Sequence, residues 1–246
     1  MIREIGFDTE KYLDAQVERI LERVSFFDKL YLEFGGKLRY DHHASRVLPG
    51  FDLDTKVRML ERLGEEVEIV HCISAKDIEG RKIRRDFGLT YDDQIVKDIN
   101  DLRETGLDVS AVVINRFSNE LTARRFKQKL DNMRIRVFVH YELPNYPKDL
   151  DMVLSDKGYG RQDYVGTERK IVVVTAPGPG SGKFSFCMAQ LYNDRKRGIM
   201  SGFSKFETFP VWNLSLDHPV NVAYEAATAD IGDHNVVDRS IKGHTE

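Results

Sequence analysis

A glycine-rich stretch that ends in a lysine is the strongest candidate for chemistry in this chain. Gly178, Gly180 and Gly182 precede Lys183, after the apolar run 171–174 and directly before an amphipathic stretch. Glycines let the backbone turn tightly and direct its N–H groups at an anion. The start of the following helix adds the positive end of its dipole, and the lysine adds a full charge. With Ser181, these residues predict a phosphate-binding loop between a strand and a helix. The alternative is a plain Gly/Pro turn with an incidental lysine.

The stretch departs from the strict phosphate-loop pattern at two positions. Pro177 stands where that pattern has a glycine, and Phe184 stands where it has the Ser or Thr that holds magnesium. Ser185 comes one residue later, about 100° further round a helix. We therefore expect Ser185 to be the magnesium ligand in this variant loop, with Asp156, at the end of a short apolar run, as the second. For Asp156 a plain turn is the alternative.

Two more residues belong to the predicted site. Glu207 lies in an aromatic run and is the expected catalytic acid, which would orient a nucleophile or bind magnesium through water. Its alternative is a charge on the wet face of a half-buried strand. Lys37 follows two glycines at the end of a predicted strand, where with Arg46 it would form a second anion site. A tight turn with solvated charges is the alternative there.

These residues predict a phosphate- or nucleotide-binding protein whose cofactor is ATP or GTP with Mg²⁺. One interpretation is a nucleotide-dependent phosphotransferase or NTPase, in which Lys183 and Glu207 are catalytic. The other is a non-catalytic binder of a phosphorylated metabolite, which the missing hydroxyl at position 184 favours. A third is a fragment that is inactive without further residues. Whether the protein is an enzyme stays open at this point.

Composition excludes several other classes of protein. A net charge of -3 in 246 residues argues against non-specific nucleic-acid binding. No apolar run approaches the roughly 20 residues of a membrane span, and the first residues do not resemble a signal peptide. Cys72 and Cys187 lie far apart and are expected to be buried thiols. We expect a cytoplasmic protein whose partner is a small phosphorylated ligand, with neither nucleic acid nor membrane as a partner. A homo-oligomer remains open.

Alternating helical and extended patterns predict the elements that position these residues. The alternation is typical of βαβ units, so the fold class is α/β, with a mostly parallel sheet flanked by helices and a phosphate-loop-like strand-loop-helix unit in a second lobe. Ligands bind beyond the carboxyl ends of such strands. The expected strands are 29–34, 67–73, 109–114, 137–140 and 171–174, and the expected helices include 8–24, 54–63, 95–106 and 121–133.

The Pro-, Gly- and Asp-rich connection 144–166 predicts a boundary between two lobes. Residues 1–150 would form an amino-terminal α/β lobe, and residues 167–238 a phosphate-loop-like α/β segment. Only about 60 residues follow Lys183, so the second lobe is expected to be incomplete. The polar end, 239–246, is expected to be a disordered tail.

Several long blocks resemble one bacterial family. They include Phe34-Gly35-Gly36-Lys37-Leu38, the run 172–183, the run 205–214 and the run 218–230. On these blocks the chain is identified as a member of the family called "domain of unknown function 1846", over residues 1 to about 238. The resemblance implies an α/β fold and a chain about twice this length, of which this is the amino-terminal half. It implies no reaction. It also implies that Pro177 is a family trait.

Overall fold

A six-stranded parallel sheet forms the centre of the molecule. The computed structural model describes residues 8–40, 51–84, 87–107 and 109–206. The strands follow the order β6-β5-β2-β7-β1-β8, and every pairing in this sheet is parallel. The strands are β1 (Lys29–Phe34), β2 (Val67–Ser74), β5 (Val109–Phe117), β6 (Val137–Tyr141), β7 (Ile171–Thr175) and β8 (Ser201–Phe206), with a small antiparallel pair of β3 (Ile83–Arg84) and β4 (Leu89–Thr90). The predicted fold class is therefore confirmed.

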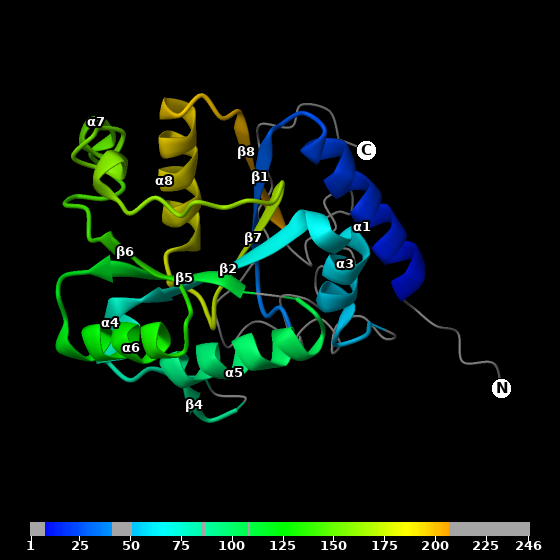
Figure 1. Cartoon of the computed structure of the whole chain (residues 1–246), viewed down its shortest axis with the longest axis horizontal. Coiled ribbons are helices and arrows are strands. Elements are labelled where there is room, and N and C mark those ends of the chain that lie inside the picture. The colour runs from blue at the N-terminus through cyan, green and yellow to red at the C-terminus, as the bar shows by residue number, and fades with distance from the viewer. Residues whose placement is uncertain (1–7, 41–50, 85–86, 108, 207–246) are drawn as a thin grey trace, which may run out of the picture.

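Helices cover both faces of this sheet (Figure 1). They are α1 (Thr9–Val24), α3 (Thr55–Leu63), α4 (Ala75–Glu79), α5 (Tyr91–Glu104), α6 (Leu121–Asn132), α7 (Leu150–Val153) and α8 (Lys183–Lys196), with short 3-10 turns η1 (Gly64–Glu66) and η2 (Tyr159–Arg161). Alternate strand residues point to opposite faces. Leu30 and Leu32 belong to the apolar core that also contains residues of α1, α3, α5 and α6, whereas Tyr31 belongs to the core that contains residues of α8. Each strand thus contributes to two apolar cores.

Local signals in the sequence explain where these helices begin and end. The Asp8 carboxylate caps α1 by accepting a hydrogen bond from the Lys11 backbone N–H at 3.1 Å. Gly64 ends α3 in a left-handed conformation, with φ 64°. Leu21 of α1 is apolar, yet its side chain is 47% exposed. It follows buried Ile20 by one residue, which turns it about 100° away from the core.

The chain reverses its direction across the sheet at β7. From β1 it runs through β2 and β5 to the edge strand β6, and it then returns to β7 between β2 and β1 before ending at the other edge, β8. Right-handed crossovers in opposite directions place their helices on opposite faces. Accordingly α8, which follows β7, lies across the sheet from α5 and α6 (Figure 1).

The predicted boundary at 144–166 does not separate two sheets. β7 belongs to the expected second lobe, yet it pairs with β2 and with β1 of the expected first lobe. All five residues of β7 are buried, which requires a neighbour along both edges of the strand and a helix layer on both faces. Residues 207–246, which include the carboxyl-terminal part of the expected second lobe and its tail, lie outside the described residues. None of the described helices has the length and apolar character that crossing a bilayer requires.

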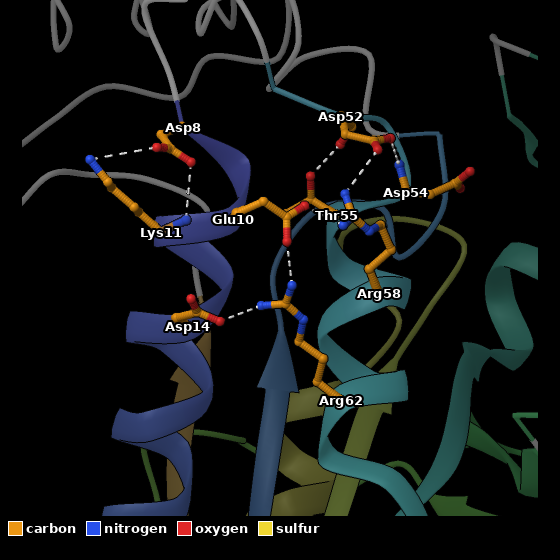
Figure 2. A network of polar contacts seen from close by, with 9 residues as sticks. All are labelled: Asp8, Glu10, Lys11, Asp14, Asp52, Asp54, Thr55, Arg58 and Arg62. Carbon is orange, nitrogen blue, oxygen red and sulfur yellow. Dashed lines mark hydrogen bonds and ion pairs between the residues drawn. The ribbon is translucent and has the colours of Figure 1, made fainter.

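An ion-pair network joins α1 to α3 on the surface (Figure 2). Arg62 of α3 donates to Asp14 of α1 at 2.6 Å and also to Glu10. Arg58, one turn earlier on α3, contacts the same Glu10 and lies 3.3 Å from Asp52. The hydrogen bond from Arg58 is the main reason that the pKa of Glu10 lies below its ordinary value of 4.5. The network therefore adds stability at neutral pH.

Replacing Arg62 with alanine should lower the melting temperature by at most about 4 °C, because exposed ion pairs contribute little. The loss should shrink in 0.5 M NaCl, which screens such pairs. Because the folded-state pKa of Glu10 is depressed, its contribution is present above its ordinary pKa and disappears as the pH falls through the lower, folded value. Thermal unfolding at pH 7 and pH 3 measures this. Arg19→Ala, which breaks a pair within α1 only, is the control. A salt-independent loss would contradict the prediction.

Candidate functional site

A cavity of about 450 Å³ lies at the carboxyl ends of the parallel strands. This size is within the range of small-molecule sites. The chain segments that line it follow or end β1, β5, β6 and β7: Glu33, Asn115, Arg116, His140, Tyr141, Glu142, Leu143, Tyr146, Gln162, Gly180, Ser181, Gly182, Lys183, Phe184 and Ser185. β7, where the chain reverses across the sheet, contributes through the residues that follow it. Ligands of open α/β sheets bind at such a point.

Residues 176–182, which we call the glycine loop, connect β7 to α8 along one wall of this cavity. Gly180 and Gly182 both have positive φ, 76° and 84°. Gly182 is the N-cap of α8, and no side chain caps that helix by a hydrogen bond. The backbone N–H groups of a helix's first turn have no partner within the helix. The amino end of α8 therefore offers N–H groups and a positive dipole end to the cavity.

Two side chains from neighbouring elements hold the glycine loop in place. Asn115, at the end of β5, donates from Nδ2 to the Ser181 carbonyl at 2.8 Å and is 2% exposed. A Cβ on Gly182 would lie 2.8 Å from the Cβ of Asn115. On the other side of the loop, a Cβ on Gly178 would lie 2.2 Å from the hydroxyl of Tyr91. Each of these glycines therefore has a packing reason to be a glycine, whether or not an anion binds.

A bulge in β5 directs side chains to the cavity rim. The pairing of β5 with β6 shifts register between Ile114 and Phe117. Arg116 lies within this bulge with a φ of 54°, which is rare for a residue other than glycine. Bulges and such backbone outliers occur often next to functional sites. Arg116 lies 3.4 Å from Glu142, whose pKa is lowered mainly by its hydrogen bond to Lys76 and further by Arg116.

Lys183 and Glu33 bring opposite charges to the cavity. Glu33 is 7% exposed and lies on β1 beside Val174 of β7. Both charges affect the pKa of the buried Cys72 thiol. Burial raises this pKa to about 12, the charge of Lys183 lowers it and the charge of Glu33 raises it. Cys187, also fully buried, responds to the same two charges, and its pKa is raised mainly by burial. The sequence-based expectation that both cysteines are buried thiols is confirmed.

His140 adds a neutral imidazole to the cavity wall. It ends β6, is 4% exposed and has its Nε2 atom 3.0 Å from the Asp163 carbonyl oxygen. Because a carbonyl only accepts, the hydrogen-bond pattern assigns the ring proton to Nε2 and leaves Nδ1 as an acceptor. Burial lowers the pKa of His140 to about 4. The ring is therefore uncharged at neutral pH, and its Nδ1 atom is able to accept a hydrogen bond.

The structure brings together most of the predicted anion-binding residues. Gly180, Ser181, Gly182, Lys183 and Ser185 all line the cavity. Ser181 is buried, and its hydroxyl donates to the Gly178 carbonyl at 2.8 Å, so it supports the loop.

Ser185 also contacts Tyr159. The pKa of Tyr159 is raised mainly by burial and further by Tyr146, while the hydrogen bond to Ser185 lowers it.

Three predicted residues lie elsewhere. Asp156 pairs with Lys196 and accepts a hydrogen bond from Tyr192 at 2.9 Å, both in the carboxyl-terminal half of α8. These partners follow Ser185 by two or more helical turns, about 10 Å or more along the axis, so Asp156 and Ser185 do not share a site. The Asp156 carboxylate lies beside the Lys196 ammonium instead.

Lys37 is half-buried and does not line the cavity that contains Lys183. It lines a separate space of about 10 Å³, enough for a single water, together with His71, Arg84, Asp98 and the end of β7, Thr175 and Ala176. Gly178 faces Tyr91 and is not among the cavity's lining residues. Glu207 and Arg46 lie outside the described residues.

Sequence reasoning missed Glu33, Asn115 and His140. Each is a polar residue near the end of an otherwise apolar strand: Glu33 in KLYLEF, Asn115 in VSAVVINRF and His140 in VFVHY. Because parallel strands end at the same edge of a sheet, this shared feature was the available signal. Within the described ranges, no three His, Cys, Asp or Glu side chains are grouped as metal ligands would be.

Comparisons with known proteins identify the family of this chain and add no activity. The chain is 54% identical over 235 residues to a UPF0371 protein of Clostridium tetani (strain Massachusetts / E88), covering 96% of this chain and 47% of that protein. It is 55% identical over 234 residues to a UPF0371 protein of Clostridium botulinum (strain ATCC 19397 / Type A), covering 95% and 47%. The chain thus spans about half the length of the curated relatives it matches. The family described as "Domain of unknown function DUF1846, N-terminal" matches residues 5–244, and the chain belongs to that family.

Proposed function

We propose that the cavity at the carboxyl edge of the sheet binds the phosphate groups of a small phosphorylated ligand. One observation carries the proposal: the uncapped amino end of α8, the glycine loop and Lys183 line the same cavity beside the strand where the sheet reverses. Helix N–H groups and a lysine suit an anion, and a binding site is expected at that point of the sheet. Arg116 at the rim adds a second cation.

The lining also supports a nucleotide with Mg²⁺ as the ligand. Magnesium in proteins is commonly held by one or two carboxylates, by phosphate oxygens and by water. Glu33 lines the cavity on the strand beside β7 and would supply the carboxylate that Asp156 does not. Ser185 remains the hydroxyl nearest in sequence to the magnesium-binding position of the strict pattern, where this chain has Phe184.

A nucleotide-dependent phosphotransferase or hydrolase is the second candidate. Lys183 would neutralise phosphate charge, Glu33 would orient the acceptor or hold magnesium, and the neutral ring of His140 would accept a hydrogen bond. The observation that favours this candidate is that a carboxylate and a neutral imidazole line the same cavity as the lysine.

Replacing Lys183 with alanine should abolish the stabilisation of the chain by phosphate ligands and leave the fold intact. A thermal-shift titration with ATP, GTP, ADP and inorganic phosphate, each with and without Mg²⁺, measures this. A ligand at about 100 times its Kd stabilises by roughly 2.7 kcal/mol, or about 5–10 °C for a chain of this size. Lys196→Ala, at the far end of the same helix, removes an equal charge and should leave the shift unchanged.

Three outcomes separate the candidates. A shift that needs Mg²⁺ and is accompanied by release of inorganic phosphate would favour the enzyme. A shift without magnesium or turnover would favour a binder. No shift with any of these ligands, or an equal loss of shift in the Lys183 and Lys196 variants, would refute the proposed site.

A further inference from the structure

Exposed aromatic rings gather at the cavity that contains Lys183. Phe184 is 50% exposed, Tyr146 is 37% exposed and Tyr141 is 36% exposed, and all three line the cavity. They come from two parts of the chain, the first turn of α8 and the segment that ends and follows β6. Binding sites for organic ligands are commonly lined by apolar and aromatic side chains with a few polar groups among them, and this cavity combines such rings with Lys183.

Neighbouring groups support two of these rings from the protein side. Phe184 contacts Phe203 of β8 edge to face, with ring centroids 5.5 Å apart and an interplanar angle of 77°. The guanidinium of Arg161 lies 4.7 Å from the ring centre of Tyr141. A ring that is held in place and remains half exposed loses little conformational entropy when a flat ligand stacks on it. The rings are therefore suited to contact a ligand.

Phe184 also stands directly after Lys183, where the strict phosphate-loop pattern has a magnesium-binding hydroxyl. A ring at this position cannot hold a metal, but it places an apolar surface one residue away from the anion-binding lysine. A ligand that satisfies both features has a phosphate group and an aromatic ring a short distance apart.

We propose that the cavity selects phosphate esters that carry a flat aromatic ring, such as nucleotides, and that Phe184 is the ring-contacting residue. This inference rests on the proposed phosphate site and names the class of ligand that the site takes. Tyr141 and Tyr146 form the second aromatic surface of the cavity. Stacking of a base on an aromatic side chain is tolerant of base identity, so the cavity should accept more than one nucleobase.

Affinity measurements with matched probes test the inference on the 246-residue chain. ADP carries both features, ribose 5-phosphate has a phosphate ester without an aromatic ring, and pyrophosphate has phosphate alone. Isothermal titration should give a Kd for ADP at least about 10-fold lower than for either other probe. Phe184→Ala should weaken ADP binding by about 5- to 100-fold, the usual cost of removing one stacking ring. It should change pyrophosphate binding less than 2-fold, and Phe184→Tyr should retain the affinity for ADP.

Phe26→Ala is the matched control, because it removes a ring that is 64% exposed and does not line the cavity. Equal loss of ADP and pyrophosphate binding in Phe184→Ala would mean that the ring only supports the glycine loop, and it would overturn the inference. Equal affinity of the wild-type chain for all three probes, abolished by Lys183→Ala, would also overturn it while the phosphate site stands. Binding of none of the probes would overturn both.

Discussion

Replacing Gly182 with alanine should destabilise the chain by about 2–5 kcal/mol and displace the glycine loop. Two costs add at this position. Its φ of 84° is left-handed, which costs an alanine roughly 1–2 kcal/mol. The new methyl group would also lie 2.8 Å from the Cβ of Asn115, and such overpacking typically costs about 1–3 kcal/mol. Asn115 cannot move away cheaply, because its Cβ is fixed by the β5 backbone and its Nδ2 donates to the Ser181 carbonyl.

Gly180→Ala is the matched control for this prediction. Gly180 has a similar φ of 76°, but a Cβ there would meet no atom within 4 Å. Gly180→Ala should therefore cost only the strain of placing an alanine at a left-handed φ, about 1–2 kcal/mol. Urea unfolding of both variants measures the difference, and phosphate-ligand affinity should fall further in Gly182→Ala. Equal losses of stability in the two variants would show that Asn115 does not constrain the loop.

Replacing Tyr31 with phenylalanine should cost about 1.5–3 kcal/mol, the usual contribution of a hydrogen bond to a charged group. Tyr31 is fully buried on β1 and its hydroxyl donates to Asp194 of α8 at 2.8 Å. Asp194 is itself fully buried, and its other oxygen accepts from Tyr164 at 2.6 Å. A buried carboxylate that loses one of these donors keeps the cost of its desolvation. Tyr31→Phe therefore weakens the contact that fixes α8 on the sheet.

Two controls and a pH titration make this prediction specific. Tyr164→Phe removes the hydroxyl of a partly buried ring and should lower the stability less than Tyr31→Phe does. Tyr192→Phe, which only loses a surface contact to Asp156, should leave the stability nearly unchanged.

Burial, and then the charge of Asp194, raise the pKa of Tyr31 above its ordinary value of 10. The folded state therefore keeps this proton above pH 10, where the unfolded chain releases it, so stability falls as the pH rises past 10. Tyr31→Phe should lessen that alkaline loss in urea unfolding at pH 8 to 11. A loss of stability below about 0.5 kcal/mol at pH 8 would contradict the role of Tyr31.

Local patterns were enough to predict most elements of the sheet and its helices. The strand predicted at 29–34 is β1, residue for residue, and the helix predicted at 54–63 is α3 within one residue. Caps and side-chain periodicity act between residues a few positions apart, so they can be read from the chain directly. The short α4 and the β3–β4 pair were not predicted, because elements of two to five residues carry too little periodicity.

The candidate site was predictable only in its local part. The glycines, Ser181, Lys183 and Ser185 are consecutive or nearly so, and a strand-loop-helix unit brings them together without help from other elements. Asp156, which was expected to be a magnesium ligand, instead forms an ion pair with Lys196, and this pair depends on how the 144–166 connection packs against α8.

The sequence by itself determined an α/β chain with a glycine loop between a buried strand and a helix. Only the tertiary structure decided that β7 lies between β1 and β2. It also decided that Glu33, Asn115 and His140 meet the loop at one cavity. The physical reason is that strand order depends on which apolar faces and edges pack best through space. The buried strands β1, β2, β5 and β7 have nearly interchangeable apolar patterns. The polar residues that end them acquire a common role only once that order is fixed.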